Sequence, residues 1–148
     1  MYNDWTANLI VVVATAFAVS ACVIVHYEGL NGLSQWLWRR RDHHPRRKVL
    51  YGIFGVLGLH VLEIWIFGIT LWTLLGVPGT GLVTGSNPTA LLDAVYLSAI
   101  TFTTVGFGDL APVGPIRFIG GTMALTGFVL ITWSASFTYL EMERFWRR

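Results

Sequence analysis

Residues 103–109 read Thr-Thr-Val-Gly-Phe-Gly-Asp, and this stretch decides how the rest of the chain is interpreted. Gly106 and Gly108 are separated by a single residue, a placement that argues against a helix. Glycine enters backbone conformations with positive φ at little cost. A chain that alternates between ordinary and positive φ turns successive carbonyl groups toward the same side. The stretch therefore predicts an irregular loop with a row of carbonyl oxygens along one side.

The residues in front of this loop predict a helix that is too short to cross a membrane. Residues 76–88 are rich in glycine and proline and read as turns. Thr89 to Phe102 reads as a helix, with Asn87 as its N-cap and Pro88 at the first position. This helix is about 21 Å long, less than the roughly 30 Å of hydrocarbon in a bilayer. A half-helix followed by irregular backbone is tolerated at membrane depth only inside protein or beside a water-filled cavity. The alternative is an exposed loop that links two helices.

The composition of the 148 residues is that of a membrane protein. Apolar residues make up 54% of the chain and charged residues only 12%, about half of the roughly 25% typical of soluble domains. Three stretches are long and apolar enough for membrane spans, at residues 9–25 (or 6–25), 49–75 and 115–140. The single cysteine, Cys22, excludes an intrachain disulfide and a metal site built from cysteines. We expect an all-α membrane protein with three transmembrane helices, a re-entrant helix and the loop that follows it.

The positions of the basic residues predict the orientation in the membrane. Nine of the ten Lys and Arg residues follow the first or the third span, namely Arg39, Arg40, Arg41, Arg46, Arg47, Lys48, Arg144, Arg147 and Arg148. Basic residues accumulate on the cytoplasmic side of membrane proteins. We therefore expect a multi-pass protein of the cell (inner) membrane, with the N-terminus outside and the C-terminus cytoplasmic. The half-helix then enters from the outer face.

Residues 103–109 resemble the selectivity filter of the potassium channel superfamily. The helix in front, with Asp93 to Ser98 and Thr101 to Thr104, resembles the pore helix of that superfamily, and Pro112 also fits. The resemblance covers roughly residues 49–139. It implies an outer helix, a pore loop and an inner helix, preceded here by an additional transmembrane helix. The expected units are therefore residues 1–26 as this extra helix, 27–48 as a cytoplasmic interfacial helix with a basic loop, and 49–148 as the pore domain.

The resemblance also implies the residues that bind ions. Potassium ions would be held by backbone carbonyls in place of their hydration shell, and no organic cofactor is implied. The positions that match the filter are Thr104, Val105, Gly106, Phe107 and Gly108, and the first four of these would supply the carbonyl groups. The Thr104 hydroxyl would form the innermost site. Asp109 would lie at the outer mouth, either as a structural anchor or as an attractor for cations.

Two positions depart from the pattern of the superfamily. Phe107 stands where tyrosine is commonest, so it lacks the hydroxyl that would bond the surrounding aromatic residues. Tyr96 and Leu97 replace a pair of tryptophans. Because phenylalanine also occurs at this place in potassium-selective relatives, we expect selectivity to survive with a less braced filter.

The resemblance favours a passive, potassium-selective channel. A filter needs four carbonyl strands around an axis and this chain has one pore loop, so we expect a homotetramer. The alternatives are a weakly selective cation channel on the same scaffold and a non-conducting membrane adaptor. The sequence has no nucleophile beside a base and no phosphate-binding loop, so we expect neither an enzyme nor a nucleic-acid partner. It does not name the gating stimulus or any separate regulatory subunit.

Glu63 is an ionisable residue deep inside the second apolar stretch, which makes it a functional candidate by default. His60 lies three residues earlier and thus on the same helix face. In one hypothesis Glu63 bonds hydroxyls of the pore helix, such as those of Tyr96, Ser98 or Thr101, and braces the filter. In the other, His60 and Glu63 sense pH or take part in gating.

Further candidates for gating or filter support lie beside the loop and in the third span. Thr101 and Thr103 are next to the filter, and Gly127 lies near the place of the superfamily's gating hinge. A glycine inside a helix permits bending, but membrane helices also pack closely at small residues. We leave both interpretations of Gly127 open.

Residues 27–38 are typical of a helix at the membrane surface. Leu30, Leu33 and Leu37 share one face, and tryptophans stand at 36 and 38. The basic residues Arg39, Arg40, Arg41, Arg46, Arg47 and Lys48 follow at once and could contact anionic lipids. They could equally serve only as an orientation signal. The adjacent histidines 43 and 44 do not by themselves predict a metal site.

Overall fold

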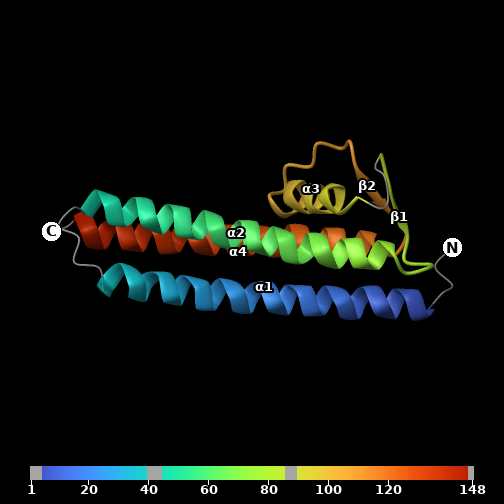
Figure 1. Cartoon of the computed structure of the whole chain (residues 1–148), viewed down its shortest axis with the longest axis horizontal. Coiled ribbons are helices and arrows are strands. Elements are labelled where there is room, and N and C mark those ends of the chain that lie inside the picture. The colour runs from blue at the N-terminus through green and yellow to red at the C-terminus, as the bar shows by residue number, and fades with distance from the viewer. Residues whose placement is uncertain (1–4, 40–44, 86–89, 147–148) are drawn as a thin grey trace.

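The computed structural model describes residues 5–39, 45–85 and 90–146, and it is built almost entirely from helices. In chain order the elements are α1 (Trp5–Arg39), α2 (Pro45–Leu75), β1 (Leu82–Thr84), α3 (Leu91–Phe102), β2 (Ala111–Val113) and α4 (Arg117–Trp146). Figure 1 shows α1, α2 and α4 side by side along the long axis, with α3 and the two short strands gathered near one end.

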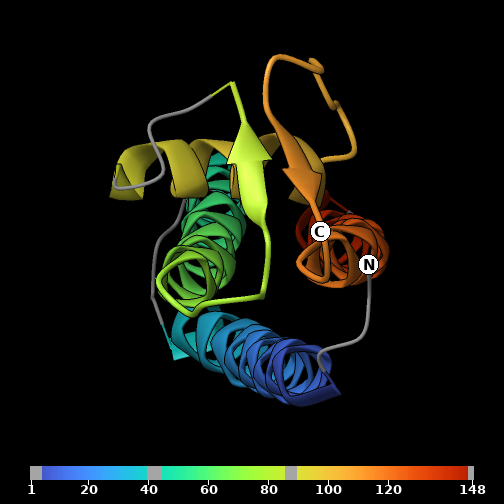
Figure 2. The ribbon, with the colours of Figure 1, turned by 90° about the vertical axis from the view of Figure 1, so that its right-hand side faces the viewer.

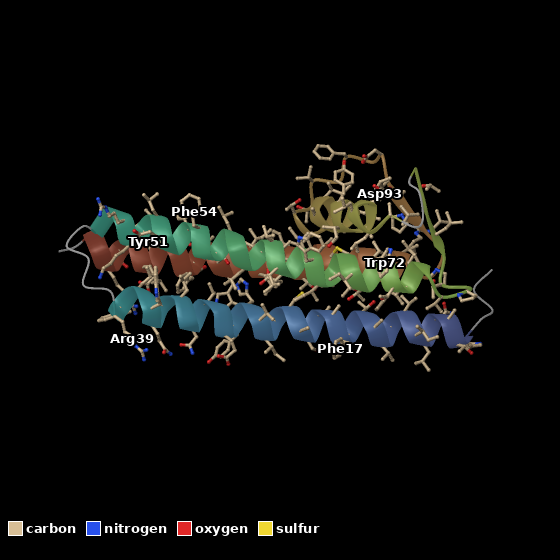
Figure 3. All side chains as sticks on the ribbon, viewed as in Figure 1. Phe17, Arg39, Tyr51, Phe54, Trp72 and Asp93 are labelled. Carbon is tan, nitrogen blue, oxygen red and sulfur yellow. The ribbon has the colours of Figure 1, made fainter. Side chains whose placement is uncertain are left out.

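Three helices are long and apolar enough to cross a membrane, over Trp5–Arg39, Arg47–Leu75 and Arg117–Arg144. They correspond to the three predicted spans, so the prediction of an all-α membrane protein is confirmed. Large apolar side chains such as Phe17 on α1 and Phe54 on α2 project away from the bundle, as Figure 3 shows, and are 76% and 69% exposed. Such side chains suit a lipid environment, because lipid chains are as apolar as they are.

The first helix is longer than predicted. It continues without interruption through residue 26, where the sequence suggested the end of a span and the start of a surface helix. Its buried residues are Ala7, Val11, Thr15, Ala18, Cys22, His26, Leu30 and Leu37. They recur every three or four residues up to Leu30, and Leu37 follows two turns later, so a single stripe faces the bundle along the whole helix. The leucines expected to lie at the membrane surface belong to this stripe: Leu30 and Leu37 are buried against protein.

Cys22 is fully buried on this stripe and packs there as a small side chain. Small side chains let membrane helices approach closely, because little lies between the two backbones. In the view along the bundle in Figure 2, α1 lies on the side of α2 and α4 that is remote from α3. The extra helix α1 thus packs against α2 and α4 on the face opposite to α3.

The short helix α3 begins later than predicted. Ala90 is its N-cap, in an extended conformation (φ −84°, ψ 111°) and without a side-chain hydrogen bond. The predicted N-cap Asn87 was therefore wrong, and residues 86–89 lie outside the described part of the chain. The helix ends at Phe102 as predicted. Ser98 is buried at its contact with α2, where its hydroxyl donates a hydrogen bond of 2.8 Å to the carbonyl of Ile64.

A two-stranded antiparallel sheet was not predicted. Strand β1 pairs with β2 in the register Leu82 with Val113 and Thr84 with Ala111. The Thr80 hydroxyl, fully buried, donates hydrogen bonds to the carbonyl groups of Leu74 (2.6 Å) and Val77 (2.9 Å). The pairing of β1 with β2 joins the segment after α2 to the segment before α4. It holds together the two ends of the segment that contains α3 and the loop.

Candidate functional site

The loop after α3 has the alternating backbone that the sequence predicts. Gly106 (φ 54°) and Gly108 (φ 83°) have positive φ, whereas the intervening Val105 and Phe107 do not. The alternation begins two residues earlier than predicted, because Thr104 also has a positive φ of 60°. Among the described residues, Thr104 is the one non-glycine residue in this conformation. It is a costly conformation for a side chain with a branched Cβ, and it makes Thr104 part of the same repeating geometry.

The loop is fastened to the C-terminal end of α3 by its own backbone amides. The amide of Thr103 donates to the carbonyl of Ala99 (3.1 Å), that of Thr104 to Thr101 (3.0 Å) and that of Gly106 to Ile100 (3.0 Å). The Thr103 hydroxyl adds a 2.7 Å hydrogen bond to Ala99. The last carbonyl groups of a helix need such partners. Thr101 and Thr103 therefore support the loop, through a backbone carbonyl and a hydroxyl respectively.

A second attachment holds the far end of the loop. The Tyr96 hydroxyl on α3 donates a hydrogen bond of 2.9 Å to Asp109 Oδ2. This bond raises the pKa of Tyr96, because it stabilises the neutral phenol beside a carboxylate. This bond ties Asp109 to α3, a contact that suits the first of the two roles predicted for it. The Tyr96–Asp109 bond also braces a loop in which Phe107 has no hydroxyl of its own.

The loop is fully exposed in the single chain. Residues 103–109 are all accessible, with Val105 57% and Phe107 71% exposed. An apolar side chain as large as Phe107 is not expected at a solvent-facing position.

Gly127 on α4 lies at a close approach of that helix to the end of α3. A Cβ atom at this position would overlap the backbone carbonyl group of Phe102, and the Phe102 ring would be 2.9 Å away. Residue 127 lies within the uninterrupted helix α4. Of the two interpretations left open, this contact favours close helix packing. Because residue 127 has no side chain, α4 can lie close to Phe102, the residue directly before the filter loop.

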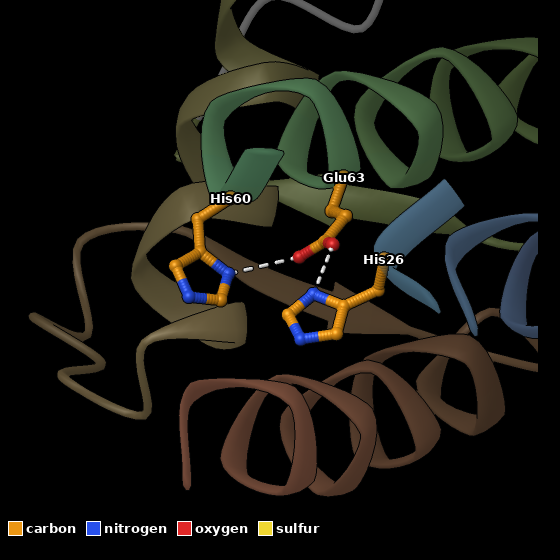
Figure 4. Close-up of side chains that lie close together, drawn as sticks. All are labelled: His26, His60 and Glu63. Carbon is orange, nitrogen blue, oxygen red and sulfur yellow. Dashed lines mark hydrogen bonds and ion pairs between the residues drawn. The ribbon is translucent and has the colours of Figure 1, made fainter. Parts of the chain in front are cut away.

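The carboxylate of Glu63 has one partner that the sequence predicted and one that it did not. Its oxygens lie 2.7 Å from His26 Nδ1 and 2.9 Å from His60 Nδ1, as Figure 4 shows. The pairing with His60 is confirmed, whereas the expected bonds to hydroxyls of the pore helix are not formed. Those hydroxyls have other acceptors: that of Tyr96 bonds Asp109 and that of Ser98 bonds Ile64.

His26 is the residue that sequence reasoning missed. It lies on α1, 37 residues before Glu63, and is fully buried. A signal was present in the sequence, because His26 follows Ala18 and Cys22 at helical spacing on the face that packs against the bundle. A polar residue on a buried stripe requires a partner across the helix interface.

Of the described basic residues, those that follow the first and third spans lie at the end of the bundle opposite to α3, whereas Arg117 begins α4 at the other end. Arg39 ends α1, Arg47 is exposed near the start of α2, and Arg144 lies in the last turn of α4. Lys48 is half-buried. The predicted lipid contacts at Arg40 and Arg41, and the histidines at 43 and 44, lie outside the described residues, as does the side chain of Arg46.

Comparison with known proteins agrees with this geometry. The model of the ion channel family matches residues 49–142, which include most of α2, all of α3, the loop and most of α4. The chain belongs to the ion channel family. It is a multi-pass membrane protein whose pore domain resembles that of potassium channels. The prediction of a potassium channel pore with an additional N-terminal helix is confirmed.

Individual relatives are distant. The chain is 25% identical to the inward rectifier potassium channel Kirbac3.1 of Paramagnetospirillum magnetotacticum, over 76% of this chain and 38% of that one. It is 33% identical to protein LctB of Geobacillus stearothermophilus, over 45% of this chain and 50% of the relative. It therefore spans about half the length of that relative. A second LctB, from Bacillus caldotenax, is 29% identical over 64% of this chain and 75% of its own length. No solved structure matches the chain at a comparable level.

Proposed function

We propose that this ion channel conducts potassium selectively. The observation that carries the proposal is the positive φ at Thr104, Gly106 and Gly108. A backbone that alternates in this way directs successive carbonyl groups toward the same side. The carbonyls of Thr104, Val105, Gly106 and Phe107 then replace the hydration shell of K⁺. The name of the Kirbac3.1 relative, an inward rectifier potassium channel, agrees with this assignment.

The proposal requires four chains around one axis. One loop supplies only one of the four carbonyl strands that surround an ion. The exposure of Val105 and Phe107 in the single chain supports the assembly, because neighbouring copies would cover these side chains. A closed ring that repeats one interface is the usual way to do this. We therefore propose a homotetramer.

The proposed orientation has the filter end outside. Arg39, Arg47 and Arg144 lie at the opposite end of the bundle, and basic residues favour the cytoplasmic side. Helix α1 begins at the filter end in Figure 1, so the N-terminus is outside and the C-terminus cytoplasmic. The exposed basic residues at the cytoplasmic end are available to anionic lipid headgroups.

A weakly selective cation channel is the second candidate. The specific observation in its favour is Phe107, which has no hydroxyl to hold the filter at a fixed diameter. The Tyr96–Asp109 bond acts against this, since it fastens the loop directly beyond Phe107. We therefore rank potassium selectivity first.

Ion flux into liposomes tests the proposal. The purified chain is reconstituted, and uptake is driven by equal gradients of K⁺ or of Na⁺. We expect K⁺ uptake at least tenfold faster than Na⁺ uptake, and a tetramer by multi-angle light scattering in detergent. Equal rates would favour the weakly selective channel. No flux of either ion, with the tetramer intact, would favour the non-conducting adaptor.

A further inference from the structure

The cluster of His26, His60 and Glu63 is not used by the proposed conduction mechanism. His26 and Glu63 are fully buried, and the side chain of His60 is 14% exposed. Figure 4 shows both imidazole rings directed at the two oxygens of the same carboxylate. The donors come from α1 and α2, so the cluster joins the extra helix to the pore domain.

The donor atoms are close enough to bind one metal ion. One ligand atom from each of the three side chains lies within 4.8 Å of the others. In a tetrahedral zinc site the metal is about 2.0–2.1 Å from nitrogen and oxygen ligands, which puts the ligands about 3.3 Å apart. The present Nδ1 to oxygen distances are 2.7 and 2.9 Å. Each Nδ1 would therefore move about half an ångström away from its oxygen. The ligand atoms, which now lie within 4.8 Å of one another, would also adjust to the spacing of about 3.3 Å around the metal.

The chemistry of the donors favours a particular class of metal. Two imidazoles with one carboxylate suit zinc and its transition-metal neighbours, whereas Ca²⁺ and Mg²⁺ prefer sites made of oxygen. With both imidazoles neutral, the cluster carries the single negative charge of Glu63 inside the bundle. A divalent cation is attracted to such a site. His60 and Glu63 are on one face of one helix, so two of the three ligands are fixed relative to each other.

A third helix completes the surroundings of the site. Ser134 on α4 is buried, and its hydroxyl lies 3.4 Å from His26 Nε2. When a histidine binds a metal through Nδ1, its Nε2 carries the proton and needs an acceptor, which fixes the tautomer and the orientation of the ring. The Ser134 hydroxyl is placed to be that acceptor.

We propose that His26, His60 and Glu63 bind one divalent transition-metal ion of the zinc class, which joins α1 to α2. Water fills the remaining coordination position. The His60 ring also lies 5.9 Å from the ring of Phe102, the last residue of the pore helix. The metal therefore fixes the extra helix against the pore domain beside the base of the filter.

Zinc content and X-ray absorption of the purified full chain in detergent test this proposal. The chain is treated with EDTA, loaded with Zn²⁺ and separated from unbound metal. We expect one zinc per chain and a spectrum with scattering from two imidazoles. Absence of zinc, or a spectrum without two imidazoles, overturns the proposal and leaves a purely hydrogen-bonded cluster. This measurement needs no variant and does not depend on ion flux, so its failure is distinct from failure of the proposed conduction.

Variants locate the site. Loss of a hydrogen-bond partner outside the ligand set lowers metal affinity by about 10- to 100-fold. Because His26→Gln and His60→Gln each remove a ligand, we expect their zinc affinity to fall by more than this. Ser134→Ala, which keeps all three ligands, should fall within that range. Glu141→Gln is the matched control, because Glu141 is another buried carboxylate in the same bundle. A variant that replaces histidines 43 and 44 controls for binding elsewhere. Zinc retained at wild-type affinity in His26→Gln overturns the proposal.

Discussion

Replacement of Gly127 by alanine distinguishes a packing role from a hinge role. A Cβ at residue 127 would overlap the carbonyl group of Phe102, and that neighbour is backbone, so it cannot rotate away as a side chain could. Overpacking of this kind costs about 1–3 kcal/mol, and backbone as the obstacle puts the value at the upper end. Alanine also gains about 1 kcal/mol of helix propensity over glycine. A matched control must remove that gain from the comparison.

Gly58→Ala is that control. Gly58 lies in α2, and a Cβ there would meet nothing within 4 Å. Both variants exchange glycine for alanine within a helix, so the difference between them isolates the contact with Phe102. We expect Gly127→Ala to be less stable than Gly58→Ala by about 1–3 kcal/mol, which lowers the apparent melting temperature by about 2–4 °C per kcal/mol.

The assay is thermal unfolding followed by the fluorescence of the seven tryptophans, in the detergent used for reconstitution. Gly127→Ala should also slow K⁺ uptake, because Phe102 directly precedes the filter loop. If Gly127→Ala melts at the same temperature as Gly58→Ala or above it, the close contact with Phe102 is refuted. An altered gating response with unchanged stability would then identify Gly127 as a hinge.

Three further substitutions test the attachments of the loop. Tyr96→Phe removes the hydrogen bond to Asp109, so the ratio of K⁺ to Na⁺ uptake should fall, whereas the control Tyr27→Phe on α1 should leave the ratio unchanged. An unaltered ratio in Tyr96→Phe would show that this bond does not brace the filter. Thr80→Val removes the buried hydroxyl that bonds the carbonyl of Leu74, so the free energy of unfolding, measured by the same thermal assay, should fall by about 1 kcal/mol. A stability equal to that of the parent chain would contradict the role given to this hydroxyl. In Gly106→Ala the new Cβ has space, but the residue must adopt a φ of 54°, which costs about 1–2 kcal/mol of conformational strain. We expect tetramers to form and K⁺ uptake to be lost. Retained uptake would argue against the proposed carbonyl geometry.

The features predicted from the sequence are those that depend on local pattern. The three spans follow from uninterrupted apolar runs, and the filter from two glycines at fixed spacing. The end of α3 at Phe102 is local too, because the residues after it cannot continue a helix. The positive φ of Thr104 was not predicted, since nothing in its type favours that conformation.

The features that were missed depend on contacts between distant segments. Strands β1 and β2 are each three residues long and pair across the whole pore loop. Strands this short have no recognisable alternation of apolar and polar residues, so the sequence did not predict them. Residues 27–38 carry aromatic residues typical of a membrane surface and are followed by basic residues, yet Leu30 and Leu37 continue a buried stripe that begins at Ala7. The partner of Glu63 on α1 depends on how two helices are rotated against each other. That rotation is set by packing, which a single sequence does not display.

The pairing of β1 with β2 has a consequence for the energetics of conduction. The sheet and the end of α3 clamp the filter segment at both of its ends, so the loss of conformational entropy on ordering residues 103–109 occurs when the chain folds. An ion that enters the proposed filter then meets oxygens that are already oriented. Little reorganisation free energy is added to the cost of dehydration at each passage, and the transit barrier is set mainly by the exchange of water for carbonyl oxygen.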